Sequence, residues 1–307
     1  MLRMAALVFC LLACAAVLAA QPIPPSIANI PYAESVDPRQ SLDLYLPEGP
    51  GPYPLLIWIH GGGWRDGSKE SAGLLPRRLL PRGIAVASIN YRLSTQAKFP
   101  AQIQDIRTAI RFLRDNASQY RLNPARFSVA GSSAGGHLAL LAGASGETTH
   151  WDTPGQLRTE TSAAVQAVVS LFGPSDFLQM SPAQPPTCPE VNRSQPSAAE
   201  SQLLGCLIND CPERVREASP LTYLTAAAPP FLLLHGAHDC LVPSHQSRLA
   251  AESLAGLGVP HIYRELPGAS PGGPPFNLAP VTSLMDDFLV QALGADRALP
   301  LAGSADG

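Results

Sequence analysis

Short apolar runs alternate along this chain with longer amphipathic stretches, an order that few folds can accommodate. The runs are rich in β-branched or aromatic residues, as the strands of a buried parallel sheet are, and they occupy residues 54–60, 84–90, 127–131, 164–172 and 229–236. Residues 41–47 alternate polar and apolar side chains, which predicts a half-exposed strand, and 261–268 is expected to form the last strand.

Helical periodicity fills the gaps between these runs. Apolar residues recur at three- and four-residue spacing between Ile103 and Leu113, which predicts an amphipathic helix from Pro100 to about Tyr120. Further helices are expected from residue 135 onward, over 244–257 and over 278–293. Alternating strands and helices form a mostly parallel sheet with helices on both faces, so the predicted fold class is α/β.

The length and composition fit one catalytic-sized domain. With 307 residues, 46% of them hydrophobic, the chain can bury a single large core. We assign this domain to residues 35–293, preceded by an N-terminal linker at 21–34 and followed by a C-terminal tail at 294–307. The segment at about 180–217 breaks the strand–helix rhythm, which indicates an insertion over the mouth of the sheet and not a second domain.

The charge pattern argues against one class of partner. The formal net charge of −3 is spread along the chain, without the basic patch or arginine-rich arm that nucleic-acid-binding proteins carry. We therefore expect a small, uncharged or mildly polar substrate and no nucleic acid partner.

Residues 1–20 have the layout of a secretory signal peptide, with Arg3 ahead of an apolar run that ends in small residues. We expect export to a secreted or periplasmic location, with cleavage near Ala19 or Ala20. One alternative is an uncleaved membrane anchor, although the run is at the short limit for a spanning helix. Another is a lipid-anchored form, because the Leu-Leu-Ala-Cys stretch at 11–14 weakly resembles a bacterial lipobox.

Removal of the leader would leave an even number of cysteines, at positions 188, 206, 211 and 240. In an oxidising compartment two disulfides are expected, and four cysteines allow three pairings. Cys206 with Cys211 is the local pairing, in which case Cys188 with Cys240 would tie the insertion to the active-site side of the sheet. A zinc site is disfavoured because no paired CxxC units are present.

The stretch FSVAGSSAGGHLAL places Gly131-Ser132-Ser133-Ala134-Gly135 between a predicted buried strand and a helix. In that setting a G-x-S-x-G sequence forms a tight, strained turn that exposes the hydroxyl of its third residue at the top of the sheet. We therefore predict that Ser133 is a nucleophile and that Ser132 is only its neighbour.

A glycine run, His60-Gly61-Gly62-Gly63-Trp64, follows the predicted strand at 54–60. Backbone N–H groups in such a run can approach a developing negative oxygen, and each donor lowers the barrier by about 3 kcal/mol. We assign the oxyanion hole to the N–H groups of Gly61, Gly62 and Ala134. A phosphate loop is disfavoured because neither G-x-G-x-x-G nor GK[ST] is present.

A carboxylate follows the strand at 229–236, where Asp239 lies far downstream of the serine. The chain order serine, aspartate, histidine is the one expected for a nucleophile of this type. We predict that Asp239 is the acid of a catalytic triad, and the alternative is a turn or helix cap.

Seven segments together resemble the acetyl esterase and feruloyl esterase-like branch of the α/β-hydrolases, near the hormone-sensitive lipase-like group. They are HGGGW, NYRLS, DIRTAIRFLRDNA, AGSSAGGHLALL, LFGPSDF, ASPLTYL and HGAHDCLVPSHQS. The likeness covers nearly all of residues 35–293. It implies an α/β-hydrolase fold and cleavage of short-chain or aromatic carboxylic esters through an acyl-enzyme on Ser133, with no metal or organic cofactor.

The chain departs from this family at its last motif, PGASPGG. The family has a catalytic histidine where this sequence has Pro271, which cannot carry a proton. Seven histidines occur elsewhere, at positions 60, 137, 150, 235, 238, 245 and 261. Most are expected to be structural: His261 begins the last strand, about 20 Å from its active-site end. There are two candidate substitutes for the catalytic base. One is His137, and the other is the group His235, His238 and His245.

Two functions remain after this comparison. The first is an exported carboxylesterase with an unusual or relocated base, and the second is a catalytically degenerate hydrolase fold that binds a ligand or a partner. A prolyl peptidase is a weaker third reading, because the chain lacks a propeller-sized N-terminal domain.

Overall fold

The computed structural model describes residues 21–146, 148–152, 159–180 and 188–295. The expected signal peptide at 1–20, its lipobox-like stretch and nearly all of the expected tail lie outside the described residues. Within the described ranges, no helix is both long and apolar enough to cross a bilayer.

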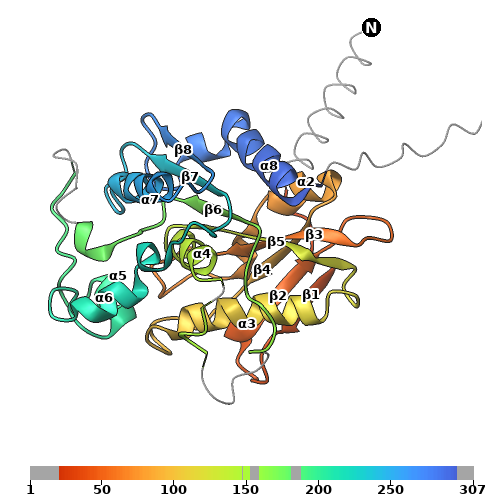
Figure 1. The fold of residues 1–307 in the computed structure, drawn as a ribbon, viewed down its shortest axis with the longest axis horizontal. Coiled ribbons are helices and arrows are strands. Elements are labelled where there is room, and N and C mark those ends of the chain that lie inside the picture. The colour runs from red at the N-terminus through yellow and green to blue at the C-terminus, as the bar shows by residue number, and fades with distance from the viewer. Residues whose placement is uncertain (1–20, 147, 153–158, 181–187, 296–307) are drawn as a thin grey trace, which may run out of the picture.

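An eight-stranded sheet forms the centre of the described chain (Figure 1), with the strand order β1-β2-β4-β3-β5-β6-β7-β8. The pairs β1–β2 and β2–β4 are antiparallel, and the remaining neighbours are parallel. The strands are β1 Ile27–Pro31, β2 Ser41–Tyr45, β3 Tyr53–Ile59, β4 Ala85–Ile89, β5 Leu122–Ser132, β6 Ala167–Leu171, β7 Phe231–Gly236 and β8 His261–Leu266.

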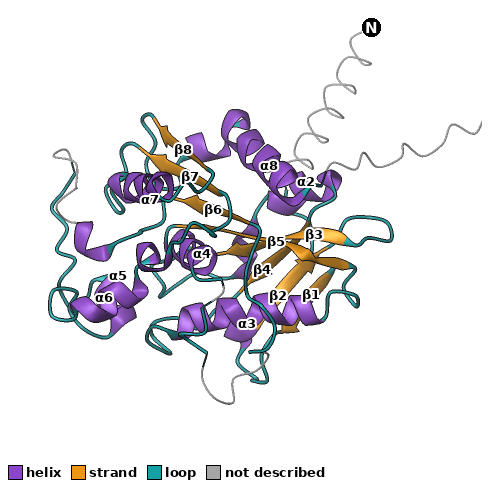
Figure 2. Cartoon of the chain, viewed as in Figure 1, coloured by secondary structure: helices purple, strands orange, loops and turns teal. Residues whose placement is uncertain are grey.

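Helices cover both faces of the sheet, as Figure 2 shows, and this confirms the predicted α/β class. The helices are α2 Leu75–Leu79, α3 Ala101–Asp115, α4 Ala134–Ala144, α5 Ala199–Leu204, α6 Pro212–Ala218, α7 His245–Gly256 and α8 Ala279–Leu293. One core layer holds the buried faces of α3, α4 and α7, and the other holds those of α2 and α8. Alternate residues of β3 enter opposite layers, which is why this strand is apolar throughout.

The N-terminal linker expected at 21–34 contains a strand, because residues 27–31 form β1 on the antiparallel edge of the sheet. Only Ile30 of this strand is buried, so no apolar run marks it in the sequence. A strand at a sheet edge needs only one buried face, and periodicity detects it poorly.

The insertion contains helices α5 and α6, and its apolar side chains join the main core layer. We therefore propose that it is part of the same domain and not a second one. Two disulfides form in this region, Cys206–Cys211 within the insertion and Cys188–Cys240 between the insertion and the loop after β7. The guanidinium of Arg65, in the glycine-rich loop after β3, donates to the carbonyl of Ser197 at 3.2 Å. The insertion thus contacts the loops that follow both β3 and β7.

Candidate active site

Ser133 lies in the turn between β5 and α4 with a φ of 53°, a left-handed conformation that a serine rarely adopts. Its flanking glycines have no room for a side chain. A Cβ on Gly131 would lie 2.3 Å from the carbonyl oxygen of Gly135, and one on Gly135 would lie 2.1 Å from that of Ile59. The sharp turn predicted from the sequence is therefore present, and close backbone packing stabilises it.

The glycine run after β3 passes directly beside this turn. A Cβ on Gly61 would lie 2.8 Å from the carbonyl oxygen of Ser132 and 3.5 Å from the Cβ of Ser133. Gly62 has a φ of +109° and a Cβ there would lie 2.2 Å from the carbonyl oxygen of Asp66, so the loop requires glycine at this position. The predicted oxyanion donors Gly61 and Gly62 thus belong to a loop packed against Ser133.

His60 packs beside this loop and forms a hydrogen bond to it. Its ring stacks on Tyr91 at 4.3 Å, and its Nδ1 donates to the carbonyl of Gly61 at 2.7 Å. Burial lowers the pKa of His60 to about 4, so the ring is neutral at pH 7. These contacts agree with the supporting role expected for His60.

Asp239 is fully buried in the turn that follows β7. Its Oδ1 accepts the backbone N–H groups of Leu241 and Val242, both at 2.8 Å. Its Oδ2 is buried and has no hydrogen-bond partner among the described residues, and Nε2 of His235 is 3.5 Å away. A carboxylate with one oxygen bound by the backbone and the other free can receive a histidine N–H.

The loop around Pro271 runs over the end of β7. The carbonyl of Ala269 accepts the N–H of His238 at 2.9 Å, which places this loop beside the turn that holds Asp239. On its other side, a Cβ on Gly272 would lie 3.7 Å from the ring of Phe172. Phe172 directly follows Leu171, whose carbonyl accepts the N–H of Ser133 at 2.8 Å. Pro271 is therefore half-buried in a loop between the surroundings of Asp239 and those of Ser133.

His137 is held by the core and cannot act as the relocated base. It is fully buried, its Nε2 donates to the carbonyl of Ala218 at 2.8 Å, and its Nδ1 accepts the indole N–H of Trp64 at 3.2 Å. Both ring nitrogens are thus used in the packing of α4. Burial lowers the pKa of His137 to about 4, so the ring is neutral at pH 7.

The histidines near β7, β8 and α7 differ in burial and in contacts. His235 is buried, with Nδ1 2.7 Å from the hydroxyl of Ser247 and Nε2 donating to the carbonyl of Val242 at 2.7 Å. His238 is exposed and His245, at the start of α7, is half-buried. His261 pairs with Phe231 at the start of β7, the end of the sheet away from Ser133, as predicted.

A cavity of about 460 Å³ opens in front of Ser133, and part of its wall comes from the insertion. Its lining includes Ala134, the loop at 62–66 and residues 191–193 and 197–200. No histidine is among the described residues that line it. Arg193 and Glu200, which the sequence analysis did not single out, form a buried ion pair in this wall at 3.3 Å. No motif surrounds them, and only their place in a cysteine-bearing insertion hints at a role.

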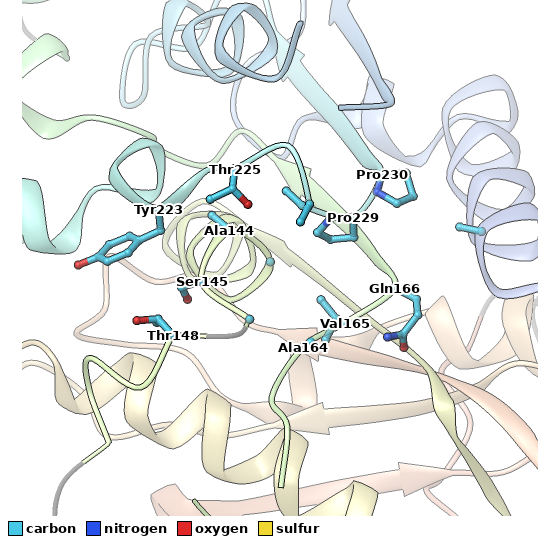
Figure 3. Close-up of a pocket in the computed structure, with 15 residues that line it drawn as sticks. Ala144, Ser145, Thr148, Ala164, Val165, Gln166, Tyr223, Thr225, Pro229 and Pro230 are labelled. Carbon is cyan, nitrogen blue, oxygen red and sulfur yellow. The ribbon is translucent and has the colours of Figure 1, made fainter. Parts of the chain in front are cut away.

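Figure 3 shows a larger cavity, of about 620 Å³, at the opposite end of the sheet. It lies between the last turn of α4 and the chain just ahead of β6 and β7, where Ala144, Val165 and Pro230 line it. None of the predicted site residues borders this cavity. Cavity size alone therefore does not locate the chemical site.

Comparison with known proteins gives a consistent family. Residues 42–254 match the BD-FAE family model. The chain is 34% identical over 248 residues to Esterase LipC of Mycobacterium tuberculosis, a match that covers 77% of this chain and 57% of the relative. The chain spans about half the length of the curated relatives it matches.

Two solved structures resemble the whole fold. A truncated carbohydrate esterase from gut microbiota superposes with a TM-score of 0.79 at 29% identity, covering 89% of this chain and all of that one. A bifunctional GH43-CE protein of Bacteroides eggerthii also has a TM-score of 0.79, at 31% identity, over 90% of this chain and 36% of its own. The matched family model, the esterase relatives and the shared architecture show that this chain belongs to the BD-FAE family of α/β-hydrolases.

Proposed function

We propose that this protein is an exported serine carboxylesterase that acts on short-chain or aromatic esters through an acyl-enzyme on Ser133. The observation that carries the proposal is the strained turn of Ser133 packed against the Gly61–Gly62 loop. The similarity to LipC, named an esterase, and to solved carbohydrate esterases supports ester chemistry. The polar residues Asn192, Gln195 and Ser197 are among those that line the cavity, and their chemistry would suit a hydroxylated alcohol portion.

In this mechanism Ser133 Oγ bonds to the acyl carbon, the ester C–O bond breaks and the alcohol leaves. The negative oxygen formed on the way would be bound by the N–H groups of Gly61, Gly62 and Ala134. Water then cleaves the acyl-enzyme and releases the acid. The proton of Ser133 has to reach the departing alcohol oxygen, and no histidine lines the described cavity wall to carry it.

The second candidate function is a degenerate hydrolase that binds a ligand or partner without turning it over. Two observations favour it, namely proline at position 271 and an Oδ2 of Asp239 that has no hydrogen-bond partner in the described part of the chain. In a comparable serine hydrolase, loss of the histidine lowers kcat by about 10⁶ and leaves about 10³ to 10⁴ over water. A chain with this defect would have only residual activity.

An activated acetate ester distinguishes the two functions when it is offered to the parent, Ser133→Ala, Pro271→His and the double variant. Activity of the parent that disappears in Ser133→Ala would exclude the degenerate protein. If Pro271→His raises activity by about 10² or more over the parent, and the double variant loses it again, a relocated base in the parent is excluded. A fluorophosphonate probe reports independently whether the Ser133 hydroxyl is activated.

Export is the second part of this proposal. It rests on the signal-like sequence of residues 1–20 and fits the two disulfides, which persist in oxidising compartments. Mass spectrometry of the mature chain tests it, because a cleaved protein begins near residue 20. A lipid-modified Cys14 at the new N-terminus would support the anchored form, and an intact Met1 would contradict export with cleavage.

A further inference from the structure

One peptide group near Asp239 is hydrogen-bonded at both of its ends. The N–H of Val242 donates to Oδ1 of Asp239 at 2.8 Å, and the carbonyl of Leu241, on the same peptide plane, accepts from Nη2 of Arg193 at 2.5 Å. Rotation of this plane would break both contacts together. Arg193 and the carboxylate of Asp239 are therefore joined through a single rigid unit.

The side chain of Arg193 is buried and paired at this position. Its side chain is only 5% exposed, and Nη1 contacts Oε1 of Glu200 at 3.3 Å. Both residues belong to the insertion and line the cavity in front of Ser133. A buried cation is costly unless it is paired and hydrogen-bonded, so the Glu200 carboxylate and the Leu241 carbonyl explain why the arginine stays in place.

We propose that Arg193 is a positioning residue for Asp239, through which the insertion sets the orientation of the triad acid. The charged donor polarises the peptide group that it binds, and so strengthens the Val242 N–H as a donor to Asp239. The Cys188–Cys240 disulfide ties the same two segments together one residue before Leu241. The inference rests on the proposed role of Asp239 in ester hydrolysis.

The chemical consequence depends on a histidine beside the acid. A carboxylate held in a fixed plane orients an imidazole and stabilises its protonated form, as a triad aspartate does. A displacement of about 1 Å in such an arrangement costs up to about 10² in rate. Loss of Arg193 should therefore reduce kcat and weaken the support of the imidazolium.

The test uses the full chain with Pro271→His as background and adds Arg193→Met or Arg193→Lys. Arg193→Met should lower kcat about tenfold or more. It should also move the acid limb of the pH–rate profile to lower pH, because an imidazolium with less carboxylate support loses its proton more easily. Arg193→Lys, which keeps the charge and one donor, should recover part of the loss.

Arg111→Met is the matched control. Arg111 is also a buried arginine, bound to both carboxylate oxygens of Asp152, and it does not line the cavity. Its loss should destabilise the fold without moving the acid limb. An acid limb that moves equally in both variants, or in neither, would overturn the role of Arg193.

Amide hydrogen exchange gives a readout that does not need activity. In the parent chain, Arg193→Met should raise the exchange rate of the Val242 amide about tenfold or more relative to Arg111→Met. If neither the parent nor Pro271→His hydrolyses the ester, the proposed esterase function fails while this measurement still decides the positioning role. Unchanged protection at Val242 would contradict the inference.

Discussion

The two halves of the candidate site differ in what keeps their residues in place. On the nucleophile side, the turn of Ser133 and the Gly61–Gly62 loop interlock through backbone contacts too close for any side chain. On the acid side, Asp239 lies in a capped turn, and the loop at 267–273 beside it is largely exposed. On the acid side such a contact occurs at Gly236, where a Cβ would lie 2.4 Å from the carbonyl oxygen of Ala269, whereas positions 270–273 are exposed or half-buried.

This difference affects what the glycines on the nucleophile side indicate about catalysis. Gly131 and Gly135 would be needed for close packing of α4 against β3 and β5 even in a chain without activity. Their presence is therefore weak evidence for catalysis. Position 271 carries more information about function, because the fold does not require a particular residue there. So does Oδ2 of Asp239, which has no hydrogen-bond partner among the described residues although it is buried.

The largest effect is expected on the nucleophile side. Gly135→Ala should lower the free energy of unfolding by about 3 kcal/mol or more, because its Cβ would overlap the carbonyl oxygens of Ile59 and His60. Gly256→Ala in α7 is the control, since nothing lies within 4 Å of a Cβ there, and it should stabilise by about 0.5–1 kcal/mol. Urea midpoints measure both, and equal midpoints would break the comparison.

The second prediction also concerns the nucleophile side: acid should lower the free energy of unfolding. His60 and His137, buried with pKa values of about 4, stay neutral in the folded state, while in the unfolded chain they take up protons below pH 6.5. Their stabilisation is complete above pH 6.5 and falls by about 2 kcal/mol for each histidine on going from pH 7 to pH 5. Urea unfolding across this range measures it.

His137→Gln should flatten this pH dependence, because it removes one of the two buried rings that stay neutral in the folded state. A parent chain whose unfolding free energy is constant from pH 7 to pH 5 would show that the two buried histidines are not coupled to folding.

On the acid side, the effect depends on which atom is removed. Asp239→Ala leaves the N–H groups of Leu241 and Val242 without their acceptor and should cost about 2 kcal/mol. Asp239→Asn keeps an oxygen for them and should cost less than about 1 kcal/mol. If the two variants unfold at the same urea concentration, the carboxylate does not stabilise this turn through Oδ1.

The smallest effect is expected at position 271. Pro271→Ala should change the free energy of unfolding by less than about 1 kcal/mol, mainly through the flexibility of the unfolded chain. Its half-buried ring lies in a loop, and Pro271 takes part in none of the backbone hydrogen bonds between described residues of this loop. A loss above about 2 kcal/mol in a urea titration would show that this loop is as constrained as the nucleophile turn.

The sequence predicted what periodic patterns and glycines encode. Apolar runs predicted where β2 to β8 and the main helices lie along the chain. A G-x-S-x-G sequence between a strand and a helix predicted the sharp turn at Ser133. Edge strand β1 and the short helices of the insertion lack such patterns. The contact of Arg193 with Leu241 joins residues 48 positions apart through a backbone carbonyl, which carries no side-chain signature.

The loop around Pro271 also bears on how the chain can change over generations. Proline and histidine codons differ by a single nucleotide in two of the four proline codons. A site whose substitution hardly affects the fold can lose and regain a histidine without passing through an unfolded intermediate form. In the proposed degenerate form, one point mutation from such a codon would place a histidine at position 271, while close packing of the glycines around Ser133 keeps the nucleophile turn in place.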